Sequence, residues 1–404
     1  MTPQAHFILR VGSQNFADAK SFTPLAQVVK AKSDVLSDGS SRDFIVDRGD
    51  GLILIVVKGA FAGAGYSTGV NAMIPLGKTG HILWFLLLLF RHSVIEAASL
   101  VIGNTAISAE GLPIWVAQET GIYKKNGLDT QAVFLGGGGP RSLSVILSGE
   151  CPISHGSGLP LVNSNIGGAD LVMITGGTTT INYWLVTRPE TKSGDQLRGG
   201  YIAIGSFGTT TDFAARFALR KFALVPGKDV TLLPVGNNPV RLGALETGRV
   251  VATPLNPPAS VMAQKKGLNV LVDISALGIP WPHTGAITTR KYIREHTDTV
   301  RRFVRSYVEA VHRIKTDRET GMKILAKYFK GLQDRDILIK TYDLSFSEAV
   351  MPRKQYATLD GIKTIIDYVA ETDARAKKAK PEDFVDMRFI KELDDSGYTD
   401  SLYK

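Results

Sequence analysis

The fold class follows from residues 100–140, which read LVIGNTAISAEGLPIWVAQETGIYKKNGLDTQAVFLGGGGP. The apolar run 100–102 predicts a strand, and the pattern over 112–120 predicts a helix that a glycine ends. A second strand is expected over 132–135, after which four glycines lead through Pro140 into another helix. Strands that alternate with helices in this way are typical of parallel α/β units.

The same alternation continues beyond this stretch. Further strands are expected at 151–155, 170–174 and 183–187 and, after a polar stretch, at 201–204, 230–235, 250–253 and 270–272. Further helices are expected at 141–148, 209–221 and 240–247, and the pattern beyond residue 291 is almost wholly helical, with helices at 300–315, 319–329, 335–344 and 356–370.

Two segments of the chain echo each other. Gly139-Pro140 begins a leucine-rich helix that ends before Gly149, and Asn238-Pro239 begins another that ends before Gly248 at the same spacing. The repeat indicates two lobes of related topology. Two lobes also suit a chain of this length, because single hydrophobic cores stop growing at about 250–300 residues.

The apolar run 82–90 has the pattern of a secretory signal peptide. Lys78 and His81 precede it, and the small residues Ala97 and Ala98 follow it as a cleavage site. A membrane span needs about 20 apolar residues, which this run does not reach. A buried helix or a membrane anchor remains the alternative interpretation.

The position of this signal suggests where synthesis begins. Signal peptides lie at the N-terminus, so we expect translation to start at or near Met73, with residues 73–98 as the signal and 99–404 as the exported, periplasmic protein. Residues 1–72 are then an upstream misreading of the frame or a disordered extension. Their one long apolar run, 52–57, has the composition of a strand, but no neighbouring segment is a convincing partner.

Composition narrows the function. The single Cys151 excludes an intramolecular disulfide and is expected to be a buried, inert thiol. The net charge of +9 comes from dispersed residues, and the only tight cluster, Lys377-Lys378-Ala379-Lys380, resembles a solvated helix end rather than a nucleic-acid site. No familiar catalytic or zinc motif is present, so we expect a binding protein without cofactor or metal rather than an enzyme. His155, at a strand end, either reaches a cleft or is structural.

Ligands of open α/β sheets lie at the carboxyl ends of the strands, beside helix N-termini. Four loops of this chain have that position: 105–111, 136–140, 156–160 and 205–212. They are rich in Gly, Ser and Thr, which suits a small polar or anionic ligand. Helix capping is the alternative explanation for these residues, for Asp212 in particular. Five aromatic residues either stack on a ligand or belong to the core: Trp115, Tyr183, Trp184, Phe207 and Trp281.

One motif carries a family resemblance. Residues 111–129, GLPIWVAQETGIYKKNGLD, resemble the substrate-binding proteins of nitrate/sulfonate/taurine-type ABC transporters, a family that also includes thiamine-precursor-synthase-like domains. The segments 147–150 and 381–386 are similar to the family pattern as well. The resemblance implies an α/β, two-lobed type II periplasmic-binding fold, with C-terminal helices packed on lobe 1. Lobe 1 would comprise 99–187 and the return 281–404, and lobe 2 would comprise 188–280, with crossovers near 187–188 and 279–281.

The resemblance also implies a function and a site. The protein would capture a sulfonate, nitrate, carboxylate or pyrimidine-like molecule as a monomer and deliver it to an ABC permease, with no nucleic-acid partner. The ligand-binding residues, from the resemblance and from the hydroxyl-rich loop after 201–204, are expected to be Ala106, Ser108, Glu110, Gly137, Gly138, Gly156, Ser157, Ser206, Gly208, Thr209, Thr210 and Thr211.

Three points stay open at the level of sequence. Glu110 facing the cleft would favour a ligand with an amine group. A periplasmic ligand sensor would have the same sequence features as a transport protein. A pyrimidine-precursor-synthase-like enzyme is the third possibility, although that family depends on a Cys-rich segment and this chain has one Cys.

Overall fold

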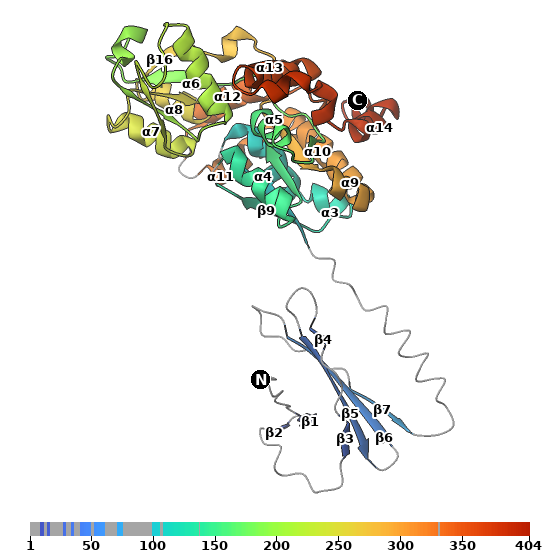
Figure 1. Cartoon of the computed structure of the whole chain (residues 1–404). Helices are drawn as coiled ribbons and strands as arrows, with labels where there is room; N and C mark the ends of the chain where they lie inside the picture. Colours follow the sequence, from blue (N-terminus) through green and yellow to red (C-terminus); the bar gives the residue numbers. More distant parts are fainter. Residues whose placement is uncertain are drawn as a thin grey trace. The chain divides into compact units, whose positions relative to one another are not determined.

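The computed structural model of the protein has two compact units, Met1–Glu96 and Ala97–Lys404 (Figure 1). It describes residues 99–105, 108–136, 138–329 and 332–404, together with the backbone of short strands between residues 9 and 75. The apolar run 82–90 and the expected cleavage site at residues 97–98 lie outside the described residues.

The first unit contains antiparallel strands. They are β1 (Leu9–Val11), β2 (Gln14–Phe16), β3 (Gln27–Val29), β4 (Asp34–Val35), β5 (Ser41–Gly49), β6 (Leu52–Ala60) and β7 (Asn71–Pro75). The apolar run 52–57 does have partners, because β6 pairs with both β5 and β7. The sequence of β5, SRDFIVDRG, has only three consecutive apolar residues, and charged residues flank them on both sides. A run this short does not predict a strand. These strands do not test whether residues 1–72 are translated, and that hypothesis stays a prediction.

Lobe 1 of the second unit is built on a five-stranded sheet. Its strands in spatial order are β11 (Leu171–Met173), β17 (Gly285–Thr289), β10 (Ile153–Gly156), β8 (Leu100–Asn104) and β9 (Thr130–Phe134). β8 is parallel to β9 and β10, whereas β17 is antiparallel to both of its neighbours. The opening strand–helix–strand unit is therefore confirmed, but the sheet is mixed rather than wholly parallel.

Lobe 2 has a second five-stranded sheet. In spatial order its strands are β14 (Thr231–Pro234), β13 (Tyr201–Ile204), β15 (Ala252–Leu255), β12 (Trp184–Thr187) and β16 (Asn269–Asp273). β13 is parallel to β14 and β15, and β12 is antiparallel to β15 and β16. The expected two-lobed α/β architecture is confirmed.

Two crossover segments connect the lobes. The chain leaves the first sheet after Met173 and enters the second at Trp184, and it returns between Asp273 and Gly285. The expected first crossover at 187–188 lies too late in the chain, because β12 already belongs to lobe 2. A short apolar strand carries no mark of the sheet it will join, so the sequence could not place this boundary. The expected second crossover, 279–281, lies within the observed segment.

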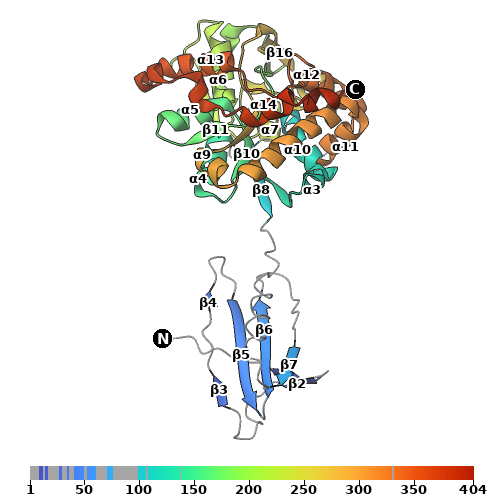
Figure 2. The same ribbon diagram turned by 90° about the vertical axis from the view of Figure 1, so that its right-hand side faces the viewer.

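Helices cover both sheets. Lobe 1 has α2 (Leu112–Glu119), α3 (Ile122–Lys125), α4 (Gly138–Ser148) and α5 (Gly158–Ile166), and lobe 2 has α6 (Thr210–Arg220), α7 (Asn238–Glu246) and α8 (Ala259–Lys265). The C-terminal helices are α9 (Arg290–Glu295), α10 (Thr297–Thr316), α11 (Arg318–Tyr328), α12 (Arg335–Phe346), α13 (Leu359–Ala370), α14 (Arg388–Asp395) and α15 (Tyr398–Ser401). Figure 2 shows most of this C-terminal group, in orange and red, gathered on one side of the unit.

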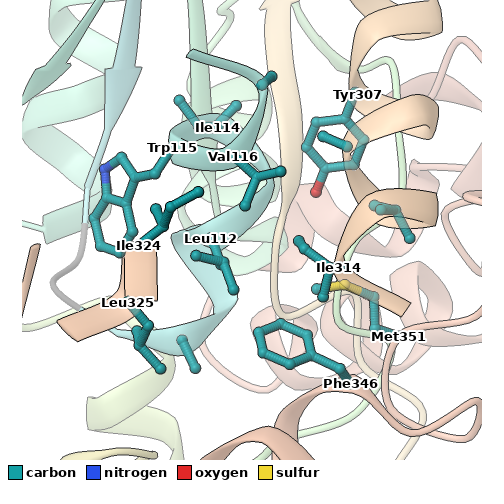
Figure 3. Close-up of a cluster of buried hydrophobic side chains, with 14 of the residues drawn as sticks. Leu112, Ile114, Trp115, Val116, Tyr307, Ile314, Ile324, Leu325, Phe346 and Met351 are labelled. Atoms are coloured by element: carbon teal, nitrogen blue, oxygen red, sulfur yellow. The ribbon is translucent and has the colours of Figure 1, made fainter. Parts of the chain in front are cut away.

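The C-terminal helices pack on lobe 1, as expected. α10 and α11 contact α2, and α13 contacts α5. In Figure 3, Trp115 of α2 faces Ile324 and Leu325 of α11, while the other side of α2 faces Tyr307 and the surrounding side chains. Trp115 also stacks on Tyr328, with ring centroids 4.6 Å apart. Each such fully buried large side chain contributes about 1.5–3 kcal/mol, so this cluster anchors the C-terminal helices to lobe 1.

Among the helices that the structure describes, none combines the length and the apolar character needed to cross a bilayer.

Candidate functional site

A cavity of about 260 Å³ lies between the two lobes. Residues of both lobes and of both crossover segments line it: Thr105, Ser108, Phe134, Gly139, Gly156, Ser157, Pro160, Tyr183, Gly205, Thr209, Thr210, Thr211, Gly236, Asn237, Asn238, Val240, Arg241, Asn256, His283 and Thr284. The volume suits a small molecule rather than a polymer, and the lining combines many hydroxyl and amide groups with a few apolar side chains.

Four helices begin at this cavity. Gly139 lies in the first turn of α4, and Ser157, Thr209 and Asn237 are the N-cap residues of α5, α6 and α7. The first N–H groups of a helix have no partner within it, and the helix dipole places partial positive charge at that end. Two helix N-termini from each lobe therefore make the cavity favourable for a negatively charged group.

Capping explains some of these polar residues but not all. Asn237 accepts a hydrogen bond from the Val240 N–H, and Asp212 accepts one from the Gly208 N–H at 2.9 Å. The N-cap side chains of α5 and α6, Ser157 and Thr209, make no capping hydrogen bond. The bond from Gly208 confirms the capping interpretation of Asp212. At the start of α5 the Gly158 N–H already donates to the Pro282 carbonyl at 3.0 Å, so the second crossover segment satisfies part of this helix start.

The hydroxyl groups at the start of α6 are held in fixed positions. Thr209 Oγ1 donates to the Ser206 carbonyl at 2.6 Å, and Thr211 Oγ1 accepts from the Gly205 N–H at 2.8 Å. Thr210 Oγ1 lies 2.7 Å from Ser157 Oγ, which belongs to the other lobe. The two lobes are thus in direct contact across the cavity.

Arg241, in the first turns of α7, is the one fully charged side chain among the described lining residues. It is 3% exposed and donates to the carbonyl oxygens of Gly236 at 2.5 Å and Pro254 at 3.1 Å, and to Asn238 Oδ1 at 2.6 Å. Its Nε has no hydrogen-bond partner among the described residues. Burial lowers the pKa of Arg241 to about 10, so it still carries a positive charge at neutral pH.

Glu110 lies behind the cavity wall rather than in it. It belongs to the short helix η2 (Ala109–Gly111), is fully buried, and is not among the lining residues. Its Oε2 accepts a hydrogen bond of 2.6 Å from Asn256 Nδ2, and Asn256 itself lines the cavity from lobe 2. Burial raises the pKa of Glu110, and the hydrogen bond from Asn256 offsets this only in part.

The two histidines near the cavity are uncharged at neutral pH. His155 Nε2 lies 3.1 Å from Tyr307 Oη in the core of lobe 1, so the structural alternative for this residue is the one the structure supports. His283, in the second crossover segment, lines the cavity. Burial lowers the pKa of His155 to about 3, with a contribution from nearby His283, and burial lowers the pKa of His283 to about 4.

The structure brings six of the expected site residues to the cavity: Ser108, Gly156, Ser157, Thr209, Thr210 and Thr211. Glu110, Ser206 and Gly208 lie close by in the same loops but are not lining residues. Gly138 begins α4, next to the lining residue Gly139. Ala106 and Gly137 lie outside the described residues.

Sequence reasoning missed the contribution of a fifth loop. Asn237, Asn238, Val240 and Arg241 follow β14 exactly as the first four loops follow their strands. The signal was present, because Asn238-Pro239 is the segment that echoes Gly139-Pro140. Asn256 and His283 had no such signal: an isolated polar residue in a loop or crossover has no periodic pattern.

Three of the five aromatic residues belong to the core. Trp115, Trp184 and Trp281 are at most 7% exposed, and none of them is a lining residue. Tyr183 lines the cavity, with its ring edge-on to that of His283. Phe207 is half exposed beside the start of α6. No group of three or more His, Cys, Asp or Glu side chains suited to a metal ion occurs within the described ranges.

Comparison with known proteins agrees with this architecture. Residues 108–319, just over half of the chain, match the family model described as NMT1/THI5 like. YtlA of Bacillus subtilis, which is named as a binding protein, is 23% identical over 202 residues, or 49% of this chain. The match covers 60% of YtlA, so the chain spans less than two thirds of this relative.

Solved structures show the same fold. A protein of Bordetella bronchiseptica RB50 matches with a TM-score of 0.65 and 18% identity over 74% of this chain and 98% of its own. The nitrate-binding protein NrtA of Synechocystis PCC 6803 has a TM-score of 0.59 and 11% identity, covering 74% and 89% of the two chains. The alkanesulfonate-binding protein SsuA of Xanthomonas axonopodis pv. citri, bound to MOPS, has a TM-score of 0.56 and 17% identity, covering 70% and 95%. The chain therefore belongs to the NMT1/THI5-like family and has the two-lobed α/β fold of periplasmic binding proteins.

Proposed function

We propose that this protein is an exported solute-binding protein that holds a small anion between its lobes and delivers it to the permease of an ABC transporter. The observation that carries the proposal is the charge of the cavity. Four helix N-termini and the buried Arg241 face it, and no carboxylate occurs among its described lining residues. Relatives with this fold include proteins named for binding nitrate and alkanesulfonate, which are both anions.

The cavity also narrows the list of expected ligands. An amine ligand needs a carboxylate in contact with it, and Glu110 is separated from the cavity by Asn256. This removes the main argument for an aminopyrimidine. Sulfonates, nitrate and small carboxylates remain, and the half-exposed Phe134 and Val240 at the cavity offer apolar contact to an organic tail.

Export and delivery are parts of the same proposal. The apolar run at 82–90 supports export through a signal peptide at 73–98. Mass spectrometry of the exported protein tests this, and peptides from residues 1–72 would contradict export through that signal. Delivery to a permease, rather than presentation to a sensor, is supported when deletion of the gene abolishes uptake of the bound anion. Retained uptake with a lost transcriptional response would favour the sensor.

The first test is thermal melting of the full-length protein against ethanesulfonate, nitrate, propionate and a pyrimidine. A ligand at one hundred times its Kd adds about 2.7 kcal/mol of stability. We expect a shift with at least one anion and none with the pyrimidine. A shift with the pyrimidine alone would overturn the proposed ligand class.

The matched variants are Arg241→Gln and Arg249→Gln. Loss of a hydrogen bond to a charged group costs about 1.5–3 kcal/mol, so we expect R241Q to weaken anion binding by at least about tenfold. Arg249 is exposed beyond the end of α7, and its variant should bind as the wild type does. Circular dichroism establishes that R241Q is folded, and Arg241→Lys, which keeps the charge, should retain part of the affinity. Unchanged affinity in R241Q would contradict the assigned site.

A further inference from the structure

A chain of buried hydrogen bonds joins a carboxyl group of lobe 1 to the guanidinium of lobe 2. Arg241 Nη2 donates to Asn238 Oδ1 at 2.6 Å, Asn238 Nδ2 donates to Asn256 Oδ1, and Asn256 Nδ2 donates to Glu110 Oε2 at 2.6 Å. The four side chains are each at most 5% exposed. We call this set, Arg241–Asn238–Asn256–Glu110, the interlobe relay.

The two ends of the interlobe relay fix its direction. A guanidinium only donates hydrogen bonds, and an ionised carboxylate only accepts them. Each amide must therefore turn its oxygen towards Arg241 and its nitrogen towards Glu110, as the structure has them. Because successive hydrogen bonds of this kind polarise one another, a change of charge at one end is felt at the other.

The charge of the relay is balanced only while the cavity is empty. At any pH above the pKa of Glu110 in the free protein, one positive guanidinium and one negative carboxylate then share a buried region. An anion bound at Arg241 adds a second negative charge to this region, and burying an uncompensated charge is costly. The balance is restored when a proton from solvent binds to Glu110.

We propose that the protein captures its anion together with one proton, which Glu110 takes up. The inference rests on the proposed function, because it needs an anion at Arg241. The carboxylate and a solvent proton form one O–H bond, and no other bond changes. Glu110 Oε1 has no hydrogen-bond partner among the described residues, so it can hold the proton while Oε2 continues to accept from Asn256.

The other titratable groups near the site have to be weighed against Glu110. His283 lines the cavity, and burial lowers its pKa to about 4, so it is uncharged at neutral pH; proton uptake that persists in E110Q would assign the proton to His283 instead. Tyr183 is the titratable side chain that interacts with both Glu110 and Arg241, and burial raises its pKa, so it stays protonated at neutral pH. Of the elements packed on η2, α2 buries no titratable side chain, and α12 buries Tyr342, whose hydroxyl donates to the Ile314 carbonyl. The charged residues of α12 are exposed, and Lys340 among them bonds Gln264.

Burial already raises the pKa of Glu110 in the absence of a ligand, and a bound anion raises it further. Binding then takes up a proton at every pH between the pKa of the free form and that of the bound form. Affinity is highest below this window and falls as the pH rises through it. A rise of about one unit in the pKa of Glu110 corresponds to about a tenfold change in Kd.

The test is isothermal titration calorimetry of the full-length protein with ethanesulfonate and nitrate, which stay ionised between pH 5 and 9. The buffers are Tris, bis-Tris and imidazole, because sulfonate buffers would compete for the site. The slope of observed enthalpy against buffer ionisation enthalpy counts the protons taken up by the wild-type protein itself. We expect uptake of up to one proton, with a Kd that rises with pH by about threefold to tenfold.

The variants assign the proton to Glu110. Glu110→Gln keeps an acceptor for Asn256 but cannot titrate, so we expect it to bind both probes with no proton uptake. Glu150→Gln, the same change on the surface of lobe 1, should keep the wild-type proton count. Binding without proton uptake at any pH overturns the relay proposal and leaves the proposed function standing. A pH dependence that persists in E110Q also overturns it, and failure of both probes and of every other anion to bind overturns both.

Discussion

The hydroxyl groups of Thr209 and Thr210 do different work at the start of α6. Thr209 Oγ1 is bonded within lobe 2, to the Ser206 carbonyl and to the Thr211 hydroxyl, whereas Thr210 Oγ1 meets Ser157 of lobe 1. The bonds of Thr209 fix the conformation of the helix start, and the bond between Thr210 and Ser157 joins the two lobes. Both groups also line the cavity. The single hydroxyl hydrogen of Thr209 is donated to the Ser206 carbonyl, whereas the Thr210–Ser157 pair uses only one of its two hydroxyl hydrogens and has the other left for a bound anion.

The double variant Thr209→Ala with Thr210→Ala is therefore expected to weaken anion binding. Leaving polar contacts unmade costs about 1–3 kcal/mol, which is about fivefold to 150-fold in Kd. Titration calorimetry with ethanesulfonate measures it. Thr247→Ala, an exposed threonine at the end of α7, is the control and should bind normally. Equal affinity in the double variant and the control would remove this loop from the site.

At the residue scale, the sequence predicted the hydroxyl groups of the cavity better than its charged residues. Ser157 and Thr209 could be found because a hydroxyl beside glycine at a strand end is a local pattern. The role of Arg241 depends on contacts with Gly236, Pro254 and Asn238, which the fold brings together. The sequence predicted that Glu110 lines the site, but in the structure it lies behind the cavity wall, because Asn256 packs between Glu110 and the cavity.

Among the elements, β17 completes the sheet of lobe 1. It returns from lobe 2 and inserts between β10 and β11, antiparallel to both. Gly285 is paired with Gly156 at one end of this strand. A Cβ at Gly285 would lie 2.3 Å from the Thr175 carbonyl oxygen and 2.8 Å from Met173 Sδ, so the backbone of the crossover passes close to this position.

Gly285→Ala is therefore expected to lower the free energy of unfolding by about 1–3 kcal/mol, the usual cost of overpacking. Gly243→Ala is the matched control: Gly243 lies inside α7, and a Cβ there meets nothing within 4 Å. Because alanine favours helix over glycine, we expect it to add about 0.5–1 kcal/mol. Urea unfolding of the two variants measures both values. An unchanged free energy of unfolding in G285A would mean that the backbone of the crossover segment shifts at no cost to make room for the Cβ.

Among the described strands of the second unit, β17 is the one that the sequence did not reveal. It reads Gly-Ala-Ile-Thr-Thr, with one large aliphatic residue, and it follows a crossover rather than a helix. The strands that were found, such as Tyr201–Ile204, are continuous apolar runs that are buried on both faces of a sheet. The helices α5 and α8 were not predicted either. The second half of α5 is polar, and α8 has only seven residues, so neither shows a sustained helical period.

At the scale of the whole molecule, contacts outside the cavity also join the two lobes. Arg220 of α6 pairs with Glu371 beyond α13 at 2.5 Å, and Lys265 of α8 pairs with Asp334 before α12. These pairs are exposed, and such pairs contribute about 0–1 kcal/mol each. Buried packing also joins the lobes, because Phe213 of α6 lies edge-on to Tyr368 of α13 with ring centroids 4.6 Å apart. We expect the solute to enter by opening at the two crossover segments, which has to separate these rings.

A reversible lock across the cavity tests this opening directly. The hydroxyl oxygens of Ser157 and Thr210 lie 2.7 Å apart, so Ser157→Cys with Thr210→Cys places two thiols in position for a disulfide. The native Cys151 should not interfere, because it is 2% exposed and burial raises the pKa of its thiol to about 12. The reduced double variant is the control for the two lost hydroxyl groups.

If binding requires the lobes to open, the order of oxidation and loading decides the outcome. Protein oxidised before ethanesulfonate is added should not bind it, and protein oxidised after loading should retain it through dialysis. A reducing agent should reverse both states. Equal binding by the oxidised and reduced forms would show that the solute reaches Arg241 with the lobes closed, through the mouth of the cavity beside Phe134 and Val240. The interlobe contacts would then be a permanent part of the fold, and the crossover segments simple connections rather than hinges.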